Sequence, residues 1–193
     1  MSRVFIINAG EAFGHSFGKL NATLAEFAQS ELSQLGHEVK LTNIADGYDI
    51  ENEINHFLWA DVIIYQQPAW WMGAPWTLKK YIDEVFTAGH QKLYASDGRS
   101  RTNPNKNYGK GGLLQGRHYM ISATWNAPEA AFDDADEFFE GKGFDAVYFP
   151  FHKANQFIGL APLESFSCHD VIKSPSIESD LARYKTHLQT VIK

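Results

Sequence analysis

The sequence predicts an α/β protein with a parallel sheet that helices cover on both faces. Residues 4–7 and 61–66 are short, continuous apolar runs rich in β-branched side chains, which are typical of strands buried on both faces. Helical segments follow these runs along the chain. Because strands that alternate with helices are joined by crossovers, they form a parallel sheet between two helical layers.

The first half of the chain reads as three strands with two helices between them. The apolar side chains from Leu20 onward recur at helical spacing, and Gly36 ends that pattern as a C-cap. The order strand, helix, strand, helix, strand is predicted over residues 4–7, 20–35, 37–44, 54–60 and 61–66.

The second half continues the alternation. A helix starts at Pro75, which suits a first helical turn, and its predicted inner face is Trp76, Ile82, Val85 and Phe86. A fourth strand, two helices and a last strand are then predicted over residues 117–125, 127–139, 151–159 and 163–172. The C-terminal helix is marked by Leu181, Tyr184, Leu188 and Val191.

One stretch, residues 87–116, shows almost no periodicity. Its roughly 30 residues exceed the ~12–15 of an ordinary loop, so a compact domain carries it for a function. Its Asn, Lys, Gly and Ser content is also compatible with disorder, and both interpretations stay open. The whole chain of 193 residues is predicted to form a single domain over residues 1–193.

Composition excludes several functional classes. A net charge of −6 argues against nucleic acid as the main partner. The lone Cys168 rules out an intramolecular disulfide and a cysteine zinc cluster, and it suits a reducing cytoplasm. No segment approaches the ~18 apolar residues of a membrane span, and the N-terminal apolar run is too short for a signal peptide. The eight histidines form no close ligand pair, so no metal site is predicted.

The loop after the first strand, "HSFGKLN", combines small and polar residues at the start of a helix. Ser16 and Asn21 can donate or cap, Gly18 allows close backbone approach, and a helix N-terminus favours phosphate. His15 is a further candidate phosphate donor. The loop matches neither phosphate-binding glycine motif, so an ordinary capped helix start is the alternative.

Two further loops leave strand ends with unusual composition. In "QPAWWMGAP" the adjacent tryptophans cannot both face the core, so at least one should lie at a pocket or interface, or else pack beneath the long loop. "TWNAPEA" places Thr124, Trp125 and Asn126 at the next strand end, where a simple turn is the alternative. Together the three loops describe a slot for a flat heteroaromatic ring with a phosphorylated tail, which a flavin fits best.

The chain resembles the bacterial modulator of drug activity B family of NAD(P)H:quinone reductases, which are related to the mammalian quinone reductases. The resemblance covers nearly the whole chain and is carried by "HSFGKLN", "FLWADVIIYQQPAWWMGAPWTLKKYIDEVF", "LYASDGR", "ISATWNAPEAAF" and "FPFHKANQFIG". It implies a flavodoxin-like fold with a five-stranded parallel sheet and a homodimer that binds one FAD per subunit. It also favours NADPH as the electron donor.

The resemblance also implies the site residues. His15, Ser16, Gly18, Leu20 and Asn21 would hold the pyrophosphate and ribityl groups of FAD. The isoalloxazine ring would meet Ala69, Trp70, Trp71 and Met72 on one side and Thr124, Trp125, Asn126 and Ala127 on the opposite edge. Tyr108, in the long loop, would also contact FAD, and the tyrosine that does so would belong to the partner subunit.

The implied activity is two-electron, ping-pong transfer of hydride from NADPH to a quinone. No catalytic residue is predicted, because "TWNAPEAAF" stands where the mammalian enzymes have a Gly-rich turn and a Tyr/His pair. Ala69 stands where the family pattern leads us to expect glycine. The alternative is a flavodoxin-like electron carrier or redox-dependent binding protein, and an FMN-binding reductase is a nearer alternative.

Overall fold

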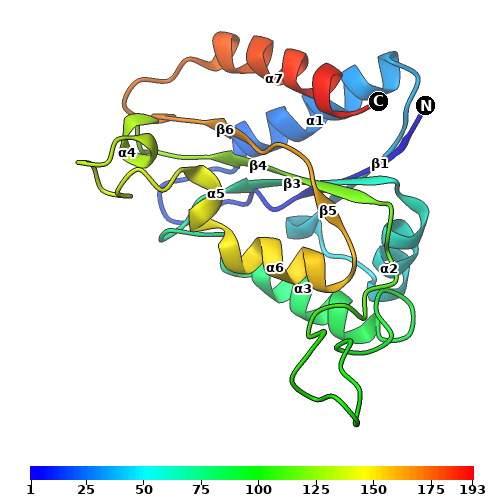
Figure 1. The fold of residues 1–193 in the computed structure, drawn as a ribbon. Coiled ribbons are helices and arrows are strands. Elements are labelled where there is room, and N and C mark those ends of the chain that lie inside the picture. Colours follow the sequence, from blue (N-terminus) through cyan, green and yellow to red (C-terminus); the bar gives the residue numbers. More distant parts are fainter.

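The structure, a computed structural model, describes residues 1–193 and consists of a parallel sheet between two layers of helices (Figure 1). The strands pair in the order β2-β1-β3-β4-β5, and β6 also pairs with β4. This order confirms the predicted flavodoxin-like architecture, with one strand more than expected. The strands are β1 Arg3–Asn8, β2 Glu38–Asn43, β3 Val62–Pro68, β4 His118–Thr124, β5 Ala161–Pro162 and β6 Phe166–Cys168.

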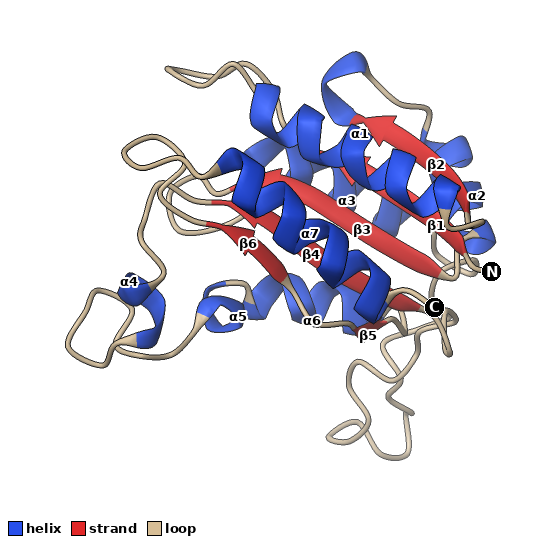
Figure 2. Ribbon diagram, turned by 90° about the horizontal axis from the view of Figure 1, so that it is seen from above, coloured by secondary structure: helices blue, strands red, loops and turns tan.

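The helices divide between the two faces of the sheet. Figure 2 shows α1 and α7 lying across one face, while α2, α3 and α6 lie on the other in Figure 1. Each face therefore has its own buried core, of 14 residues under α1 and α7 and of 25 on the opposite side. The helices are α1 Lys19–Gln34, α2 Ile50–Trp59, α3 Trp76–Ala88, α4 Ala130–Asp133, α5 Phe144–Val147, α6 Phe149–Phe157 and α7 Ile177–Val191, with a 3-10 turn, η1, at Ile44–Asp46.

The helix predicted over residues 127–139 is wrong in length, because only α4 forms there. Asp134 adopts an extended backbone directly after α4, and its side chain accepts a hydrogen bond from the Asp136 N–H. Such local side-chain bonds compete with the helical ladder. The crowded acidic run also places like charges within one helical turn of each other, which disfavours continuation.

Two other expectations are corrected. Within the last predicted strand, residues 163–172, only the three residues of β6 form a strand, and the additional strand β5 precedes that range and ends at Pro162, which lacks an N–H. Trp76 lies outside the inner face of α3 and is 60% exposed. It is the first residue of that helix, and the buried stripe runs through Leu78, Ile82 and Val85 instead.

Residues 87–116 are largely folded, although they contain little regular structure. After α3 ends at Ala88, two arms of the segment run side by side, with Ala95 N–H donating to the Gly111 oxygen at 2.9 Å. A side chain at Gly111 would collide with the Ser96 backbone, so this close approach requires glycine. Leu93 and Leu114 are buried in the core, and the tip of the segment projects from the molecule (Figure 1).

Candidate functional site

Three loops meet at the carboxyl end of the sheet and enclose a cavity of about 310 Å³. Helix α1 leaves β1 toward one face and α3 leaves β3 toward the other, so their loops diverge at the switch point where open α/β sheets bind ligands. Nine of the predicted site residues line this cavity: His15, Ser16, Gly18, Leu20, Asn21, Ala69, Trp70, Thr124 and Asn126.

The N-terminus of α1 is open toward this cavity. Gly18 occupies the N-cap position with φ +69°, and no side chain caps the helix. A Cβ at Gly18 would lie 2.9 Å from the Glu11 carbonyl carbon, so the turn requires glycine. The first-turn N–H groups are left without side-chain partners, which suits an anionic group such as a phosphate.

A buried chain of hydrogen bonds fixes two polar side chains of the cavity wall. Asn21 Nδ2 donates to Thr124 Oγ1 at 3.1 Å, while Asn21 Oδ1 accepts from Gln66 Nε2 at 2.8 Å. Ser122 Oγ donates to Gln66 Oε1 at 2.7 Å, which completes the chain. All four residues are buried, so Asn21 and Thr124 are held in one orientation by groups that lie outside the cavity.

These features fit a flavin. The cavity offers backbone N–H groups for phosphate, an oriented amide and hydroxyl, and an aromatic wall. That wall is Trp70, whose ring lies 4.6 Å from the ring of Phe13. The Trp70 N–H donates to the Gly73 oxygen at 3.0 Å, and this hydrogen bond closes the loop that carries Trp70.

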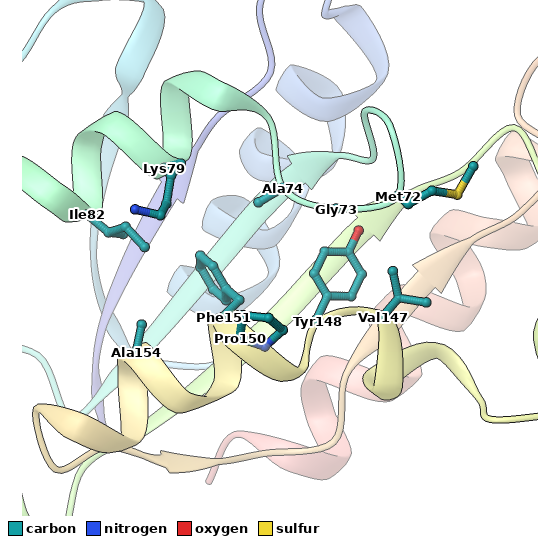
Figure 3. Close-up of a pocket in the computed structure, with 10 residues that line it drawn as sticks. All are labelled: Met72, Gly73, Ala74, Lys79, Ile82, Val147, Tyr148, Pro150, Phe151 and Ala154. Atoms are coloured by element: carbon teal, nitrogen blue, oxygen red, sulfur yellow. The ribbon is translucent and has the colours of Figure 1, made fainter. Parts of the chain in front are cut away.

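Trp71 and Met72 lie outside this first cavity. Both have positive φ, +45° and +66°, which is unfavourable for residues other than glycine. The Trp71 side chain is 95% exposed. Met72 borders a second cavity between α3 and α6, together with Gly73 and Ala74 (Figure 3).

The β4–α4 loop presents its residues alternately to the two faces. Thr124 and Asn126 line the first cavity, whereas the Trp125 side chain is only 5% exposed and packs edge-on against Phe132 and Tyr148. Any contact of Trp125 with a group in the first cavity would therefore come from its backbone. The two-residue alternation of a strand is the sequence signal that separates Trp125 from its neighbours.

Other predicted residues lie farther from the cavity. Tyr108 is 71% exposed on the long loop, where its ring lies 5.7 Å from Phe157 and 5.5 Å from the Arg99 guanidinium. It borders neither cavity. Ala127 belongs to the β4–α4 loop but does not line the first cavity; its oxygen accepts from the Asp170 N–H and lies 3.3 Å from His169 Nδ1. Burial lowers the pKa of His169, so its ring favours the neutral form.

Sequence reasoning missed several lining residues. Val171 and Ile172 come from the β6–α7 loop, which also leaves the carboxyl end of a strand and could have been included on that ground. Phe17 and Lys19 belong to the β1–α1 loop and helix start. No group of three or more His, Cys, Asp or Glu side chains is arranged to hold a metal ion. None of the helices is both long and apolar enough to span a bilayer.

Comparisons with known proteins agree with this architecture. The model of a family described by its flavodoxin-like fold matches residues 2–191. The NADPH:quinone oxidoreductase MdaB of Haemophilus influenzae is 56% identical over 188 residues, which are 97% of this chain and 98% of that protein.

Two solved structures share the fold. A Klebsiella pneumoniae protein assigned as a quinone reductase superposes with a TM-score of 0.76 at 24% identity, covering 98% of this chain and 85% of that one. General stress protein 14 of Treponema denticola, solved with FMN, has a TM-score of 0.70 at 20% identity and covers 97% and 98% of the two chains.

The near-complete match to MdaB confirms the resemblance predicted from the sequence and the expectation of an enzyme. The chain belongs to the flavodoxin-like fold family and, within it, to the NADPH:quinone oxidoreductases of the modulator of drug activity B type.

Proposed function

We propose that this protein is an FAD-dependent NADPH:quinone oxidoreductase that works by two-electron, ping-pong transfer. The observation that carries the proposal is the uncapped N-terminus of α1 facing the same cavity as the fixed Asn21 amide and the Trp70 ring. The 56% identity to an NADPH:quinone oxidoreductase supports both substrates. The FMN bound to the Treponema denticola neighbour supports a flavin on this fold.

Each part of the site has a physical task. The first-turn N–H groups of α1 bind the phosphate end of the cofactor, and Asn21 and Thr124 orient the groups next to it. Trp70 covers a ring face and excludes water from it. When bound, the flavin supplies reversible two-electron chemistry between nicotinamide and quinone. The protein therefore contributes binding, orientation and a dry environment.

The finer parts of the proposal rest on the family resemblance. FAD, rather than FMN, would extend its adenosine part beyond the first cavity. In a homodimer, Tyr108, which borders neither cavity of its own chain, would contact the FAD of the partner subunit. A cytoplasmic location agrees with the single, free and buried Cys168.

The test is to release the cofactor by denaturation, identify it by chromatography, and assay the intact enzyme with menadione and either NADPH or NADH. FAD at one per chain and turnover preferring NADPH are expected. FMN would correct the cofactor alone, whereas the absence of any flavin would refute the proposal.

An electron carrier is the second candidate, and the exposed Trp71 and Met72 are the observation that favours it. A carrier presents apolar groups beside its cofactor for a protein partner. It would be reduced slowly by either nicotinamide, which separates it from the enzyme in the same assay.

A further inference from the structure

The hydroxyl of Tyr119 is the buried end of a series of hydrogen bonds that reaches solvent. Tyr119 lies on β4, and its Oη is 2.6 Å from Nδ1 of His152 on α6. His152 Nε2 is 3.3 Å from Asp145 Oδ1, and Asp145 also accepts from the Ser165 hydroxyl at 2.7 Å. The exposed fraction rises from 0% at Tyr119 to 12% for the His152 side chain and 62% for the Asp145 side chain. The series therefore connects a buried phenol to the surface.

The direction of these hydrogen bonds is fixed by the carboxylate. An ionised carboxylate can only accept, so His152 Nε2 carries a proton and donates it to Asp145. In a neutral imidazole the other nitrogen then has no proton, so Nδ1 accepts the hydrogen bond from the Tyr119 hydroxyl. The bond from His152, with that from Ser165, holds the pKa of Asp145 below its ordinary value, which keeps this carboxylate ionised. A proton that leaves Tyr119 therefore has a base 2.6 Å away, with a negative charge behind that base.

The other buried tyrosines lack an imidazole partner. The hydroxyl of Tyr65 donates to an amide oxygen, which does not take up a proton, and the hydroxyls of Tyr148 and Tyr184 have no hydrogen-bond partner. Tyr81 donates to a carboxylate at 2.5 Å. Imidazole is the stronger base of these two acceptors, with an ordinary pKa of about 6.5 against about 4.3 for a glutamate. Among the five buried tyrosines, Tyr119 therefore has the most favourable acceptor for its proton.

The buried position of Tyr119 makes the proton acceptor decisive for its oxidation. Burial, with the nearby charge of Asp145, raises the pKa of Tyr119, so the phenol does not ionise beforehand. Removal of an electron alone would leave a positive charge in the apolar core, which is costly. Transfer of the proton to His152 at the same time leaves a neutral ring in the core and places the positive charge beside Asp145. The arrangement therefore favours loss of the electron and the proton together.

An open surface cavity of about 360 Å³ brings small molecules close to Tyr119. This cavity lies along α5 and α6, apart from the first and second cavities, and its lining is mostly polar. Asp145 and His152 belong to the lining, together with Lys153 and Pro162. Because His152 borders the cavity and also contacts the Tyr119 hydroxyl, one imidazole ring separates a molecule in the cavity from Tyr119.

We propose that Tyr119 is a redox-active tyrosine, which a small one-electron oxidant of the peroxyl radical class oxidises from this surface cavity. The electron passes from Tyr119 to the peroxyl radical, which takes a proton from solvent and becomes a hydroperoxide. The O–H bond of Tyr119 breaks and its proton bonds to His152 Nδ1, which gives a neutral phenoxyl radical and an imidazolium paired with Asp145. An electron from a one-electron donor and the return of the same proton restore the tyrosine. The proposal does not depend on the function proposed above.

The test exposes the purified protein to peroxyl radicals, made by photolysis of a water-soluble azo compound in aerated buffer, and freezes it for electron paramagnetic resonance. Protein with ring-deuterated tyrosine identifies a tyrosyl signal, because deuteration narrows that signal. Wild-type protein should give a neutral tyrosyl radical, and Tyr119→Phe should lose most of it. Tyr81→Phe is the matched control, because it removes another buried hydroxyl that donates to an ionisable side chain, and it should keep the signal.

His152→Gln tests the proton acceptor and leaves the core side chains in place. A glutamine oxygen can accept the hydrogen bond from Tyr119 but cannot take up its proton, so the tyrosyl signal should fall as it does in Tyr119→Phe. A full signal in either Tyr119→Phe or His152→Gln would overturn the proposal. An equal loss of signal in Tyr81→Phe would also overturn it, as would wild-type protein that consumes peroxyl radicals without forming a tyrosyl radical.

Discussion

At the scale of single residues, the buried amide of Gln66 fixes the orientation of the Asn21 side chain in the wall of the first cavity. Gln66→Leu leaves Asn21 Oδ1 and the Ser122 hydroxyl without partners, so we expect the flavin Kd to rise about tenfold and the free energy of unfolding to fall by about 1–3 kcal/mol. Flavin fluorescence titration and urea denaturation measure the two effects.

The matched control for Gln66 is Asn155→Leu. Asn155 is an equally buried amide that accepts from the Tyr65 hydroxyl at 2.6 Å and donates to the Phe151 oxygen at 3.0 Å, away from the first cavity. The Asn155→Leu variant should lose a similar amount of unfolding free energy and keep the wild-type flavin affinity. Equal flavin affinity in both variants would show that Gln66 does not position Asn21.

A pair of glycines in the β1–α1 loop separates backbone strain from crowding. Gly18→Ala should lower stability by about 1–3 kcal/mol and weaken flavin binding, because Gly18 has φ +69° and its Cβ would meet Glu11. Gly14 has a similar φ of +59°, but no atom lies within 4 Å of the place that an added Cβ would take. Gly14→Ala therefore introduces backbone strain without crowding. Thermal unfolding of both variants measures the difference, and an equal loss would contradict the role of crowding at Gly18.

The positions of some predicted site residues follow from spacing alone, while their contact with a cofactor stays a prediction. Ser16, Gly18 and Asn21 follow a strand and open a helix, so their place at the carboxyl edge follows from the alternation of elements. The partners of Asn21 could not be predicted, because Gln66 and Ser122 approach it only through strand order and register. Trp71 was expected to face a ring, and its exposure depends on a backbone conformation that sequence does not reveal.

At the scale of elements, the junction of α5 and α6 is held to β4 by a short hydrogen-bonded series. Tyr119 Oη lies 2.6 Å from His152 Nδ1, His152 Nε2 lies 3.3 Å from Asp145, and Ser165 donates to Asp145 at 2.7 Å. The bond from His152, with that from Ser165, holds the pKa of Asp145 below its ordinary value of 3.8. This junction places Tyr148 beside the second cavity.

Asp145→Asn should therefore destabilise the protein near neutral pH but not in acid. A folded pKa below the unfolded one gives stability that is present above the unfolded value and is lost as the pH falls through the folded value. Because the Asp145 side chain is 62% exposed, the effect should stay below about 1 kcal/mol. Urea denaturation of both proteins at several pH values measures it, and a difference that keeps its full size as the pH is lowered ever further below the ordinary value of 3.8 would contradict this account.

Elements with strong periodicity were predicted well, and irregular ones were not. The buried apolar runs of β1 and β3 predict strands, and the buried residues that recur at helical spacing in α1 predict a helix. The acidic stretch after α4 has apolar residues at helical spacing, but local hydrogen bonds and like charges end the helix early. Residues 87–116 are ordered by backbone pairing through glycines, which leaves no periodic side-chain signal.

At the scale of the whole molecule, the proposed dimer makes Tyr108 a test of assembly. If the partner's Tyr108 contacts FAD, Tyr108→Ala should raise the FAD Kd several-fold without changing the free energy of unfolding, because this side chain is largely exposed within its own chain. Fluorescence titration with FAD measures the affinity, and sedimentation velocity establishes the dimer. A dimer whose FAD affinity is unaffected would remove Tyr108 from the site.

The central claim, hydride transfer from NADPH to a quinone through a bound flavin, is tested most directly by anaerobic stopped-flow. The purified protein is mixed with NADPH, and the reduced enzyme is then mixed with menadione while the flavin band is followed. We expect rapid bleaching in the first mix and rapid return of the full band in the second. Slow bleaching by NADPH and NADH alike, or a reduced protein that menadione does not reoxidise, would contradict the claim.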